Sequence, residues 1–354
     1  MSRFFSSRFD ALTPYTPGEQ PQDRRYVKLN TNESPYPPSP GVSLAVAEES
    51  ERLQLYSDPE SRLLTNALAE HLGLDPSQVL VGNGSDEILN FAFMAFCDED
   101  HPAVFPDISY GFYPVFATLN RIPYREIPLR EDLSISVEDY ITGEGTVVIA
   151  NPNAPTGLSL PQKEIERLLA DNPNRIVIVD EAYVAFGGES CLPLIDRYDN
   201  LLVVRTFSKS HSLAGARLGF AAGNSALIQD LNTLKYSTNP YNVNRMTSAA
   251  GIAALRENEY YVRNCSAIAK TRDQTAVQLR AMGFEVTDSV SNFLFARHPS
   301  VGGGELYRKL KERGVLVRHL SKDRIVSYVR ITVGTPEQMD TLLRETKAIL
   351  EEYQ

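Results

Sequence analysis

Hydrophobic and polar positions alternate along the chain in a pattern that predicts a sheet with helices on both faces. Nearly continuous apolar runs, at 146–150, 177–179 and 201–204, are typical of buried strands. Between them lie stretches such as 162–170, whose apolar residues recur at helical spacing. Strands that alternate with helices favour the α/β fold class, here with a mixed, mostly parallel sheet.

The pattern changes on either side of this region. The first part of the chain is rich in proline and turn-forming residues, which exclude a helix and predict an extended arm. Beyond the alternating region, a long polar helix is expected at about 257–282, followed by short strands and a final helix from about Pro336. We therefore expect an N-terminal arm that joins the small domain (1–41), a large domain (42–254) and a smaller α+β domain (255–354).

Composition and charge indicate which kinds of molecule the protein is not expected to bind. The 354 residues carry a net charge of −10 without a run of basic residues, so binding to nucleic acid is not expected. No apolar run is long enough to span a bilayer, so membrane insertion is not expected either. Three cysteines without a CxxC pair are typical of a reduced, cytoplasmic protein, and we predict no metal ligands.

Polar residues collect where the apolar strands end, which is where ligands bind in open α/β sheets. Asn151, Asp180 and Lys209 follow three successive strands at equal spacing, so adjacent parallel strands would present them at one edge. A lysine there can attack a carbonyl carbon, and a buried carboxylate needs a partner such as a protonated ring nitrogen. Tyr183, three residues after Asp180, could reach an oxygen on the same ring with its phenol. Each residue also has a plainer interpretation. Asn151 could belong to an ordinary turn and Asp180 could cap the end of its strand, while Lys209 could lie on the surface and Tyr183 could pack in the core.

A second group of residues is suited to an anion. The segment Gly82–Glu87 opens a helix, and backbone N–H groups at the start of a helix attract phosphate. The same residue types are also common helix starters and members of surface ion pairs. A dinucleotide fingerprint fails, because Glu87 stands where its last glycine is required. The candidate phosphate ligands are Gly84, Ser85, Asp86, Thr206, Ser208 and Arg217.

Several motifs together resemble those of a known family. They are LNTNESPYPPSP, VGNGSDEIL, NPNAPTG, VIVDEAY, RTFSKSHSLAGARLGF and VRITVGTPEQM, and the likeness extends from about Leu12 to the C-terminus. The chain resembles the fold-type I aminotransferases that depend on pyridoxal 5'-phosphate, and within them the histidinol-phosphate aminotransferases. The resemblance implies a step of histidine biosynthesis, in which L-histidinol phosphate and 2-oxoglutarate give imidazole-acetol phosphate and L-glutamate.

The resemblance also implies roles for the residues at the strand ends. Lys209 would bind the aldehyde of the cofactor and later move a proton of the substrate. Asp180 would pair with the pyridine nitrogen, Asn151 and Tyr183 would contact the 3-oxygen of the ring, and Tyr110 would stack on the ring. The candidate phosphate ligands would hold the cofactor phosphate.

Substrate binding and assembly follow from the same resemblance. Arg330 matches an arginine that binds the anionic group of the substrate, and its side chain points away from the apolar side of its strand. One arginine suffices for a carboxylate, whereas Arg330 and Arg318 together would suit a phosphate dianion, although Arg318 could also be a solvated edge residue. Tyr15 and Asn32 resemble further residues of the substrate pocket. Tyr56 resembles a tyrosine that reaches the phosphate of a neighbouring subunit, which implies a homodimer with shared sites.

Other functions remain open at this stage. An aromatic-amino-acid aminotransferase and a threonine-phosphate decarboxylase would share the fold and the cofactor. A nicotinamide oxidoreductase is disfavoured by the missing glycine, and a regulator with an aminotransferase-like module would need a DNA-binding domain, for which too few residues precede the first motif. Ser210-His211-Ser212 departs from the common family pattern, and we interpret His211 as a packed residue rather than a base.

Overall fold

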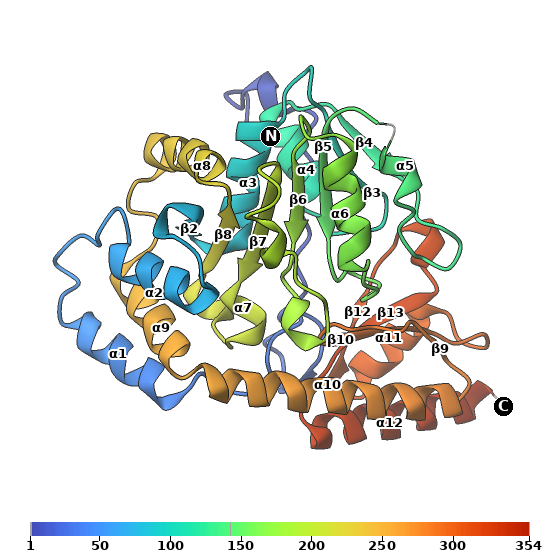
Figure 1. Ribbon diagram of the computed structural model, residues 1–354. Helices are drawn as coiled ribbons and strands as arrows, with labels where there is room; N and C mark the ends of the chain where they lie inside the picture. Colours follow the sequence, from blue (N-terminus) through green and yellow to red (C-terminus); the bar gives the residue numbers. More distant parts are fainter. Residues whose placement is uncertain (1, 142, 354) are drawn as a thin grey trace.

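The computed structural model describes residues 2–141 and 143–353, and its centre is a seven-stranded sheet (Figure 1). The strand order is β2-β8-β7-β6-β5-β3-β4, and β8 runs antiparallel to both neighbours while the other pairs are parallel. This confirms the predicted α/β fold with a mixed, mostly parallel sheet. The strands are β2 (Val79–Gly82), β3 (Ala103–Pro106), β4 (Tyr124–Ile127), β5 (Thr146–Ala150), β6 (Val177–Asp180), β7 (Leu201–Thr206) and β8 (Gly219–Gly223).

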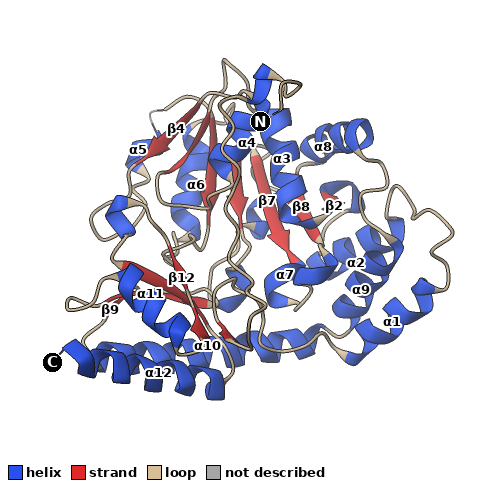
Figure 2. Ribbon diagram, turned by 180° about the vertical axis from the view of Figure 1, so that it is seen from behind, coloured by secondary structure: helices blue, strands red, loops and turns tan. Residues whose placement is uncertain are grey.

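Both faces of this sheet are buried, which explains the apolar runs in the sequence. In β6, Ile178 belongs to the core layer beneath α3 (Gly84–Phe96) and α4 (Tyr113–Asn120). Val177 and Val179 face the opposite layer, which packs against α6 (Gln162–Asp171). Because side chains alternate along a strand, Asp180 continues the row of Ile178 and points toward the side of α4. Figures 1 and 2 show the two helical layers from opposite sides.

Further helices complete this central unit. The helices α1, α2 and α9 lie side by side beyond β2 and share one apolar core with it (Figures 1 and 2). The short helix α7 directly follows β7 and carries Lys209. The bounds are α1 (Pro40–Ser50), α2 (Arg62–Leu72), α5 (Glu138–Ile141), α7 (Phe207–Ser210), α8 (Ser225–Thr238) and α9 (Arg245–Arg256).

The C-terminal part forms a second unit around a four-stranded antiparallel sheet of order β12-β13-β10-β9. Its helices lie on one side of that sheet, and the 24-residue α10 runs along the bottom of both units in Figure 1. The bounds are β9 (Glu285–Val286), β10 (Phe293–Arg297), β12 (Arg318–His319), β13 (Tyr328–Thr332), α10 (Asn258–Ala281), α11 (Gly303–Glu312) and α12 (Pro336–Leu350).

The N-terminal arm is tied to this second unit. Its strand β1 (Val27–Lys28) pairs in parallel with β11 (Val315–Leu316). The segment 315–320, which reads as one strand in the sequence, is therefore two: β11 pairs with the arm and β12 pairs with β13. This change of partner brings arm residues 29–33 alongside β13.

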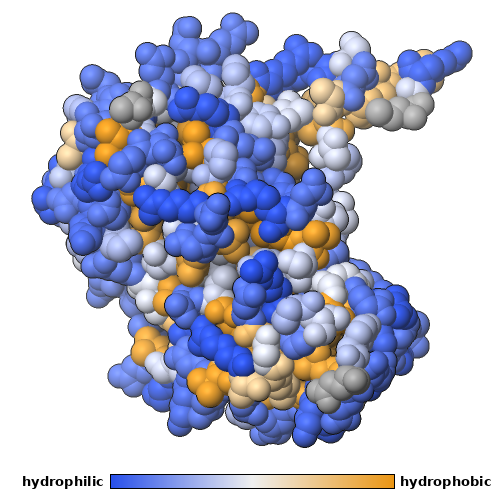
Figure 3. All heavy atoms as spheres, turned by 90° about the vertical axis from the view of Figure 1, so that its right-hand side faces the viewer, coloured by the Kyte–Doolittle hydropathy of each residue, from blue (hydrophilic) through white to orange (hydrophobic). Residues whose placement is uncertain are grey.

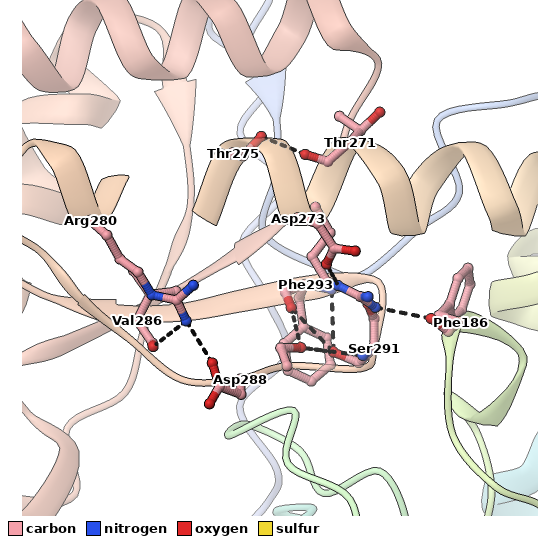
Figure 4. A network of polar contacts seen from close by, with 11 residues as sticks. Phe186, Thr271, Asp273, Thr275, Arg280, Val286, Asp288, Ser291 and Phe293 are labelled. Atoms are coloured by element: carbon pink, nitrogen blue, oxygen red, sulfur yellow. Dashed lines mark hydrogen bonds and ion pairs between the residues drawn. The ribbon is translucent and has the colours of Figure 1, made fainter. Parts of the chain in front are cut away.

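Buried contacts join the two units. The guanidinium of Arg272 on α10 donates to the carbonyl oxygens of Phe186 at 3.0 Å and Ser291 at 2.9 Å (Figure 4). A separate apolar cluster includes Ile108 from the central unit and Phe295 from β10. Viewed from the right-hand side of Figure 1, hydrophobic side chains gather in a band across the middle of a mostly hydrophilic surface (Figure 3). Because Arg272 binds the carbonyl oxygen of Phe186, the loop after Tyr183 is held by both units.

Two further features bear on the earlier expectations. The three cysteines, Cys97, Cys191 and Cys265, are free and buried. Of the helices within the described ranges, none combines the length and apolar character that a membrane span requires.

Candidate active site

Most of the predicted site residues line two adjoining cavities at the carboxyl edge of the seven-stranded sheet. The first has a volume of about 170 Å³ and the second about 330 Å³, and both are lined by Tyr110, Tyr183 and Lys209. The first is also lined by Ser85, Asp86, Asp180, Thr206, Ser208 and Arg217. The second is also lined by Tyr15, Asn32, Arg318 and Arg330.

Lys209 lies where the two cavities meet. Its half-buried amine donates to the carbonyl oxygen of Thr31 at 3.1 Å, and Thr31 belongs to the N-terminal arm. Burial, and after it the positive charge of Arg330, lowers the pKa of the Lys209 amine to about 8. A sizeable fraction of the amine is therefore neutral near pH 7–8 and able to act as a nucleophile or base.

Asp180 is a buried carboxylate with few partners. Tyr113 donates its hydroxyl to Oδ2 at 3.0 Å, and the backbone N–H of Ala182 donates to Oδ1 at 3.2 Å. Burial raises the pKa of Asp180 to about 6. Sequence reasoning missed Tyr113, because an interior tyrosine in an aromatic segment carries no signal that separates it from ordinary core packing.

The neighbouring acid shows what Asp180 lacks. Glu181 points to the other side of the strand, where the guanidinium of Arg205 lies 2.7 Å away. Among the described residues, Asp180 has no such cation within ion-pair distance. A protonated ring nitrogen in the cavity would supply the missing partner, so the geometry fits a pyridinium group.

The other end of the first cavity is suited to phosphate. The helix α3 begins there at Gly84, so the free N–H groups of its first turn face the cavity edge. Gly84 has a φ of +79°, and a Cβ on it would lie 2.5 Å from Nη2 of Arg217. The positive φ favours glycine, and the missing side chain leaves room for the guanidinium beside the helix start.

Asp86 also lies at this end, but its carboxylate is already used. Oδ2 accepts from Nη2 of Arg217 at 2.9 Å, and Oδ1 accepts from the hydroxyl of Tyr110 at 2.7 Å. A carboxylate would repel a phosphate, so only the backbone N–H of Asp86 is suited to bind one. On the opposite side, the hydroxyls of Thr206 and Ser208 lie 2.9 Å apart and are nearly buried.

The structure differs from the prediction for Asn151. Its Nδ2 donates to the carbonyl oxygen of Leu160 at 2.9 Å, and its Oδ1 accepts from the Leu160 N–H and from the hydroxyl of Ser159. The amide makes these hydrogen bonds within its own loop, and Asn151 is not among the described residues that line either cavity. Ala154, from the same loop, lines both cavities instead.

Tyr183 and Asn32 lie in direct contact. The phenol of Tyr183 accepts from Nδ2 of Asn32 at 2.9 Å. Burial raises the pKa of Tyr183, so the phenol keeps its proton. Asn32 therefore contacts Tyr183, a residue of the first cavity. It also lines the second cavity, as expected of a residue of the substrate pocket.

Two arginines dominate the second cavity. Arg318 on β12 and Arg330 on β13 are cross-strand partners, so their side chains leave the sheet on the same face. Arg318 donates to the carbonyl oxygens of Thr16 and Pro17, and Arg330 donates to that of Asn30. In the described part of the chain, neither lies within 4.0 Å of a carboxylate, and Nε of Arg330 is buried without a partner.

The charge of this cavity is wholly positive. Its described lining contains Lys209, Arg318, Lys322 and Arg330, and no aspartate or glutamate. Tyr15 of the arm also lines the cavity, and its ring packs against Phe112 at a centroid distance of 4.5 Å. Such a cavity attracts an anion despite the acidic balance of the whole chain.

Tyr56 is placed differently from the other candidates. It is 80% exposed, stacks on Tyr241 and is not among the described residues that line either cavity. Leu53 and Leu55, directly before it, are each 56% exposed. Among residues 2–141 and 143–353, none forms a hydrogen bond with the Tyr56 hydroxyl, so its predicted role toward another subunit stays a prediction.

The segment Ser210-His211-Ser212 packs away from the cavities. The ring of His211 contacts those of Phe207 and Tyr261, and its Nδ1 lies 2.8 Å from the Ser210 hydroxyl. Burial lowers the pKa of His211 to about 3. This confirms the interpretation of His211 as a packed, neutral residue.

Comparison with known proteins gives a consistent result. Residues 24–345 match the model of the family described as aminotransferase class I and II. The chain is 46% identical over 352 residues to the histidinol-phosphate aminotransferase of Brachyspira hyodysenteriae, and 48% identical over 353 residues to histidinol-phosphate aminotransferase 1 of Bordetella parapertussis. Each match covers 99% of both proteins.

A solved structure shares the fold. It is the histidinol-phosphate aminotransferase of Sinorhizobium meliloti in complex with pyridoxal-5'-phosphate, with a TM-score of 0.89 over 99% of both chains. Its sequence is 23% identical, so this likeness concerns the architecture.

Proposed function

The chain belongs to the class I and II aminotransferase family, and we propose that it transfers an amino group from L-histidinol phosphate to 2-oxoglutarate. The observation that carries this substrate assignment is the pair of facing arginines in a cavity with a wholly positive lining. A single carboxylate needs one arginine, whereas a phosphate dianion engages two. The products are imidazole-acetol phosphate and L-glutamate, as required in histidine biosynthesis.

The cofactor is pyridoxal 5'-phosphate, and the first cavity fits it at both ends. When bound, it supplies a carbonyl group that exchanges for the amino group and a ring that accepts electrons. The buried carboxylate of Asp180 would keep the ring nitrogen protonated. The start of α3, the hydroxyls of Thr206 and Ser208, and Arg217 would hold the phosphate.

Lys209 is the residue that we assign to covalent attachment and to proton transfer. Its Nζ is partly neutral near physiological pH because burial lowers its pKa. Once the substrate has displaced it, the same Nζ can take the proton from the substrate α-carbon and return it elsewhere. The carbonyl oxygen of Thr31 holds the amine at the junction of the two cavities, close to both tasks.

The arginines orient the substrates. Arg330 and Arg318 would bind the phosphate of L-histidinol phosphate, which stands where an amino acid has its α-carboxylate. In the return half of the reaction, Arg330 would bind the α-carboxylate of glutamate. Tyr110 is suited to cover the ring of the cofactor, because Asp86 fixes its hydroxyl at 2.7 Å.

We also propose that the protein is a cytoplasmic homodimer with shared sites. The exposed side chains of Leu44, Leu53, Leu55, Tyr56 and Leu63 lie on α1, on α2 and between them, and their burial against a second copy would remove apolar surface from water. Tyr56 would then donate its hydroxyl to the cofactor phosphate of the partner. We also propose that each chain consists of an N-terminal arm (1–41), a large domain (42–254) and a small domain (255–354).

Single amino donors test the substrate assignment. The purified holoenzyme is mixed with L-histidinol phosphate, phenylalanine or threonine phosphate, and the visible absorption of the cofactor is followed by stopped flow. We expect rapid loss of the band with L-histidinol phosphate, and formation of glutamate once 2-oxoglutarate is added. Rapid loss with phenylalanine alone would establish an aromatic aminotransferase instead, and release of carbon dioxide from threonine phosphate a decarboxylase. Lys209→Ala is the control, since it retains the arginines.

A further inference from the structure

Asn32 occupies an unusual position between three parts of the molecule. It lies on the N-terminal arm, is 1% exposed and has a φ of +56°, in the left-handed region. Its backbone N–H donates to the hydroxyl of Thr332 at 2.9 Å, and its carbonyl oxygen accepts from Nδ2 of Asn292 at 2.9 Å. Both partners belong to the C-terminal unit, so the backbone of Asn32 is fixed to that unit on two sides.

The side chain of Asn32 is fixed as well. The hydroxyl of Thr332 donates to Oδ1 of Asn32 at 3.1 Å, which leaves Nδ2 to face the phenol of Tyr183 at 2.9 Å. An amide nitrogen is only a donor, so the phenol oxygen must accept in this contact. The proton of Tyr183 then has to point elsewhere.

The only open direction for that proton is the cavity. Within residues 2–141 and 143–353, no atom accepts a hydrogen bond from the Tyr183 hydroxyl, and Tyr183 lines both cavities. The ring itself is held, because Phe293 meets it edge-on at a centroid distance of 5.0 Å. The loop that follows is anchored through Phe186 to Arg272.

We propose that Asn32 is a positioning residue: it makes the Tyr183 hydroxyl an obligatory donor into the cavity, toward the 3-oxygen of the bound cofactor. This inference rests on the proposed function. It gains weight from Asn151, whose amide is turned into its own loop and leaves Tyr183 without help from that residue. Through Thr332 and Asn292, Asn32 also couples the placement of the C-terminal sheet to the ring of the cofactor.

The variant Asn32→Asp tests the direction of the hydrogen bond. A carboxylate at this position can only accept, so the Tyr183 proton would turn toward residue 32 and away from the cofactor. The 3-oxygen would then hold more negative charge and bind the proton that it shares with Nζ of Lys209 more tightly. The pH midpoint of the visible absorption change of the holoenzyme should therefore rise by about one unit or more, since hydrogen bonds to charged groups are of that strength.

Other titratable groups near Tyr183 set the background of this titration. Arg330 from β13, Asp180 from β6 and Tyr15 from the arm face its phenol. A matched control for added charge is Asn30→Asp, because Asn30 is equally buried, lines the second cavity and makes no contact with Tyr183 among the described residues. Asn30→Asp should move the midpoint much less than Asn32→Asp.

A double-variant cycle completes the experiment. Tyr183→Phe alone should raise the midpoint, as Asn32→Asp does. In a protein that already carries Tyr183→Phe, adding Asn32→Asp should shift the midpoint little more than adding Asn30→Asp. Equal midpoints for wild type and Asn32→Asp, or full additivity in the cycle, would overturn the inference. If Asn32→Asp does not fold, Thr332→Val replaces it. This variant removes the donor to Oδ1 of Asn32, so that Oδ1 becomes free to accept from Tyr183, and the midpoint should rise by a smaller amount. An unchanged midpoint would contradict the inference. Failure of the wild type to bind the cofactor at all would instead refute the proposed function.

Discussion

Arg318 and Arg330 stand directly opposite each other in the antiparallel pair β12–β13, and no carboxylate in the described ranges pairs with either. Like charges in directly opposite positions of a sheet repel each other. The backbone carbonyl oxygens that they contact compensate only part of that repulsion. A doubly charged anion between the two guanidinium groups would remove the remaining repulsion, as the proposed function requires.

Loss of one guanidinium should reduce phosphate-dependent turnover most. We expect Arg318→Met, which keeps much of the apolar stem, to lower kcat/KM for L-histidinol phosphate roughly ten- to a hundredfold, because one charge-assisted contact is removed. The half-reaction with glutamate, which uses Arg330, should fall much less. Steady-state and single-turnover kinetics on both substrates check this, with Arg318→Lys as the charge-preserving control. An equal loss on both substrates would argue against a phosphate site at Arg318.

Asp180 should make the cofactor-free protein less stable as the pH rises from about 4 to above 6. Burial raises its pKa from 3.8 to about 6, so the folded state holds this proton more tightly than the unfolded chain. The resulting stability is present below pH 4 and is lost as the pH rises through 6. At pH 8 the loss is on the order of 3 kcal/mol, at about 1.36 kcal/mol per pH unit.

Asp180→Asn removes this titration. The cofactor-free variant should melt at a higher temperature than the wild type at pH 8, with the difference disappearing near pH 4. Calorimetry across that range gives the measurement. Conversion of the amino donor by the reconstituted variant should be strongly impaired, since an amide does not keep the ring nitrogen protonated. A cofactor-free variant that is less stable than the wild type at pH 8 would contradict the role of the buried charge.

Gly84 should be required for cofactor binding. Gly84→Ala places a methyl group 2.5 Å from Nη2 of Arg217 and strains a backbone with a φ of +79°. We expect at least a tenfold weaker affinity for pyridoxal 5'-phosphate, because Arg217 must leave the start of α3. Gly215→Ala is the matched control, since a Cβ there meets no described atom within 4 Å. Spectrophotometric titration of the cofactor-free variants distinguishes the two, and equal affinities would refute the requirement.

Shared sites can be tested by mixing inactive variants. If Tyr56 serves the site that contains Lys209 of the partner subunit, then Tyr56→Ala and Lys209→Ala should restore activity when they are unfolded and refolded together. Random pairing makes half of the dimers mixed, and each mixed dimer has one intact site, so about a quarter of wild-type activity is expected. Refolding each variant alone provides the baseline. Absence of any recovery, with mixed dimers shown by mass spectrometry, would place Tyr56 in its own subunit's site.

The sequence predicted the parts of the fold that have strong local signals. The buried strands β5, β6 and β7 were expected within a residue or two, because both of their faces are apolar. β4 was not expected, since it is an edge strand with mostly exposed residues and thus lacks the apolar run. The division of 315–320 between two sheets could not be predicted either. It arises because β11 pairs with β1, which lies nearly the whole chain away in sequence.

The candidate site shows the same limit. Lys209, Asp180 and Arg217 were found because a charge beside apolar or small residues is costly and therefore informative. The direction of the Asn151 side chain was not predictable, since a turn-forming asparagine can bind its own loop or a ligand equally well. Tyr113, which donates to Asp180, gave no signal because its hydroxyl finds a partner only through the tertiary fold.

The parallel pairing of β1 with β11 has a consequence for the synthesis of the protein. Val27 pairs with Val315, so the chain up to residue 315 must leave the ribosome before the arm can take its place. Thr31 and Asn32, which contact Lys209 and Tyr183, follow β1 on the same arm and should take their places with it. The central sheet can thus be assembled while the nascent chain still lacks a competent catalytic centre, and the ability to retain the cofactor should arise only after release of the C-terminal strands.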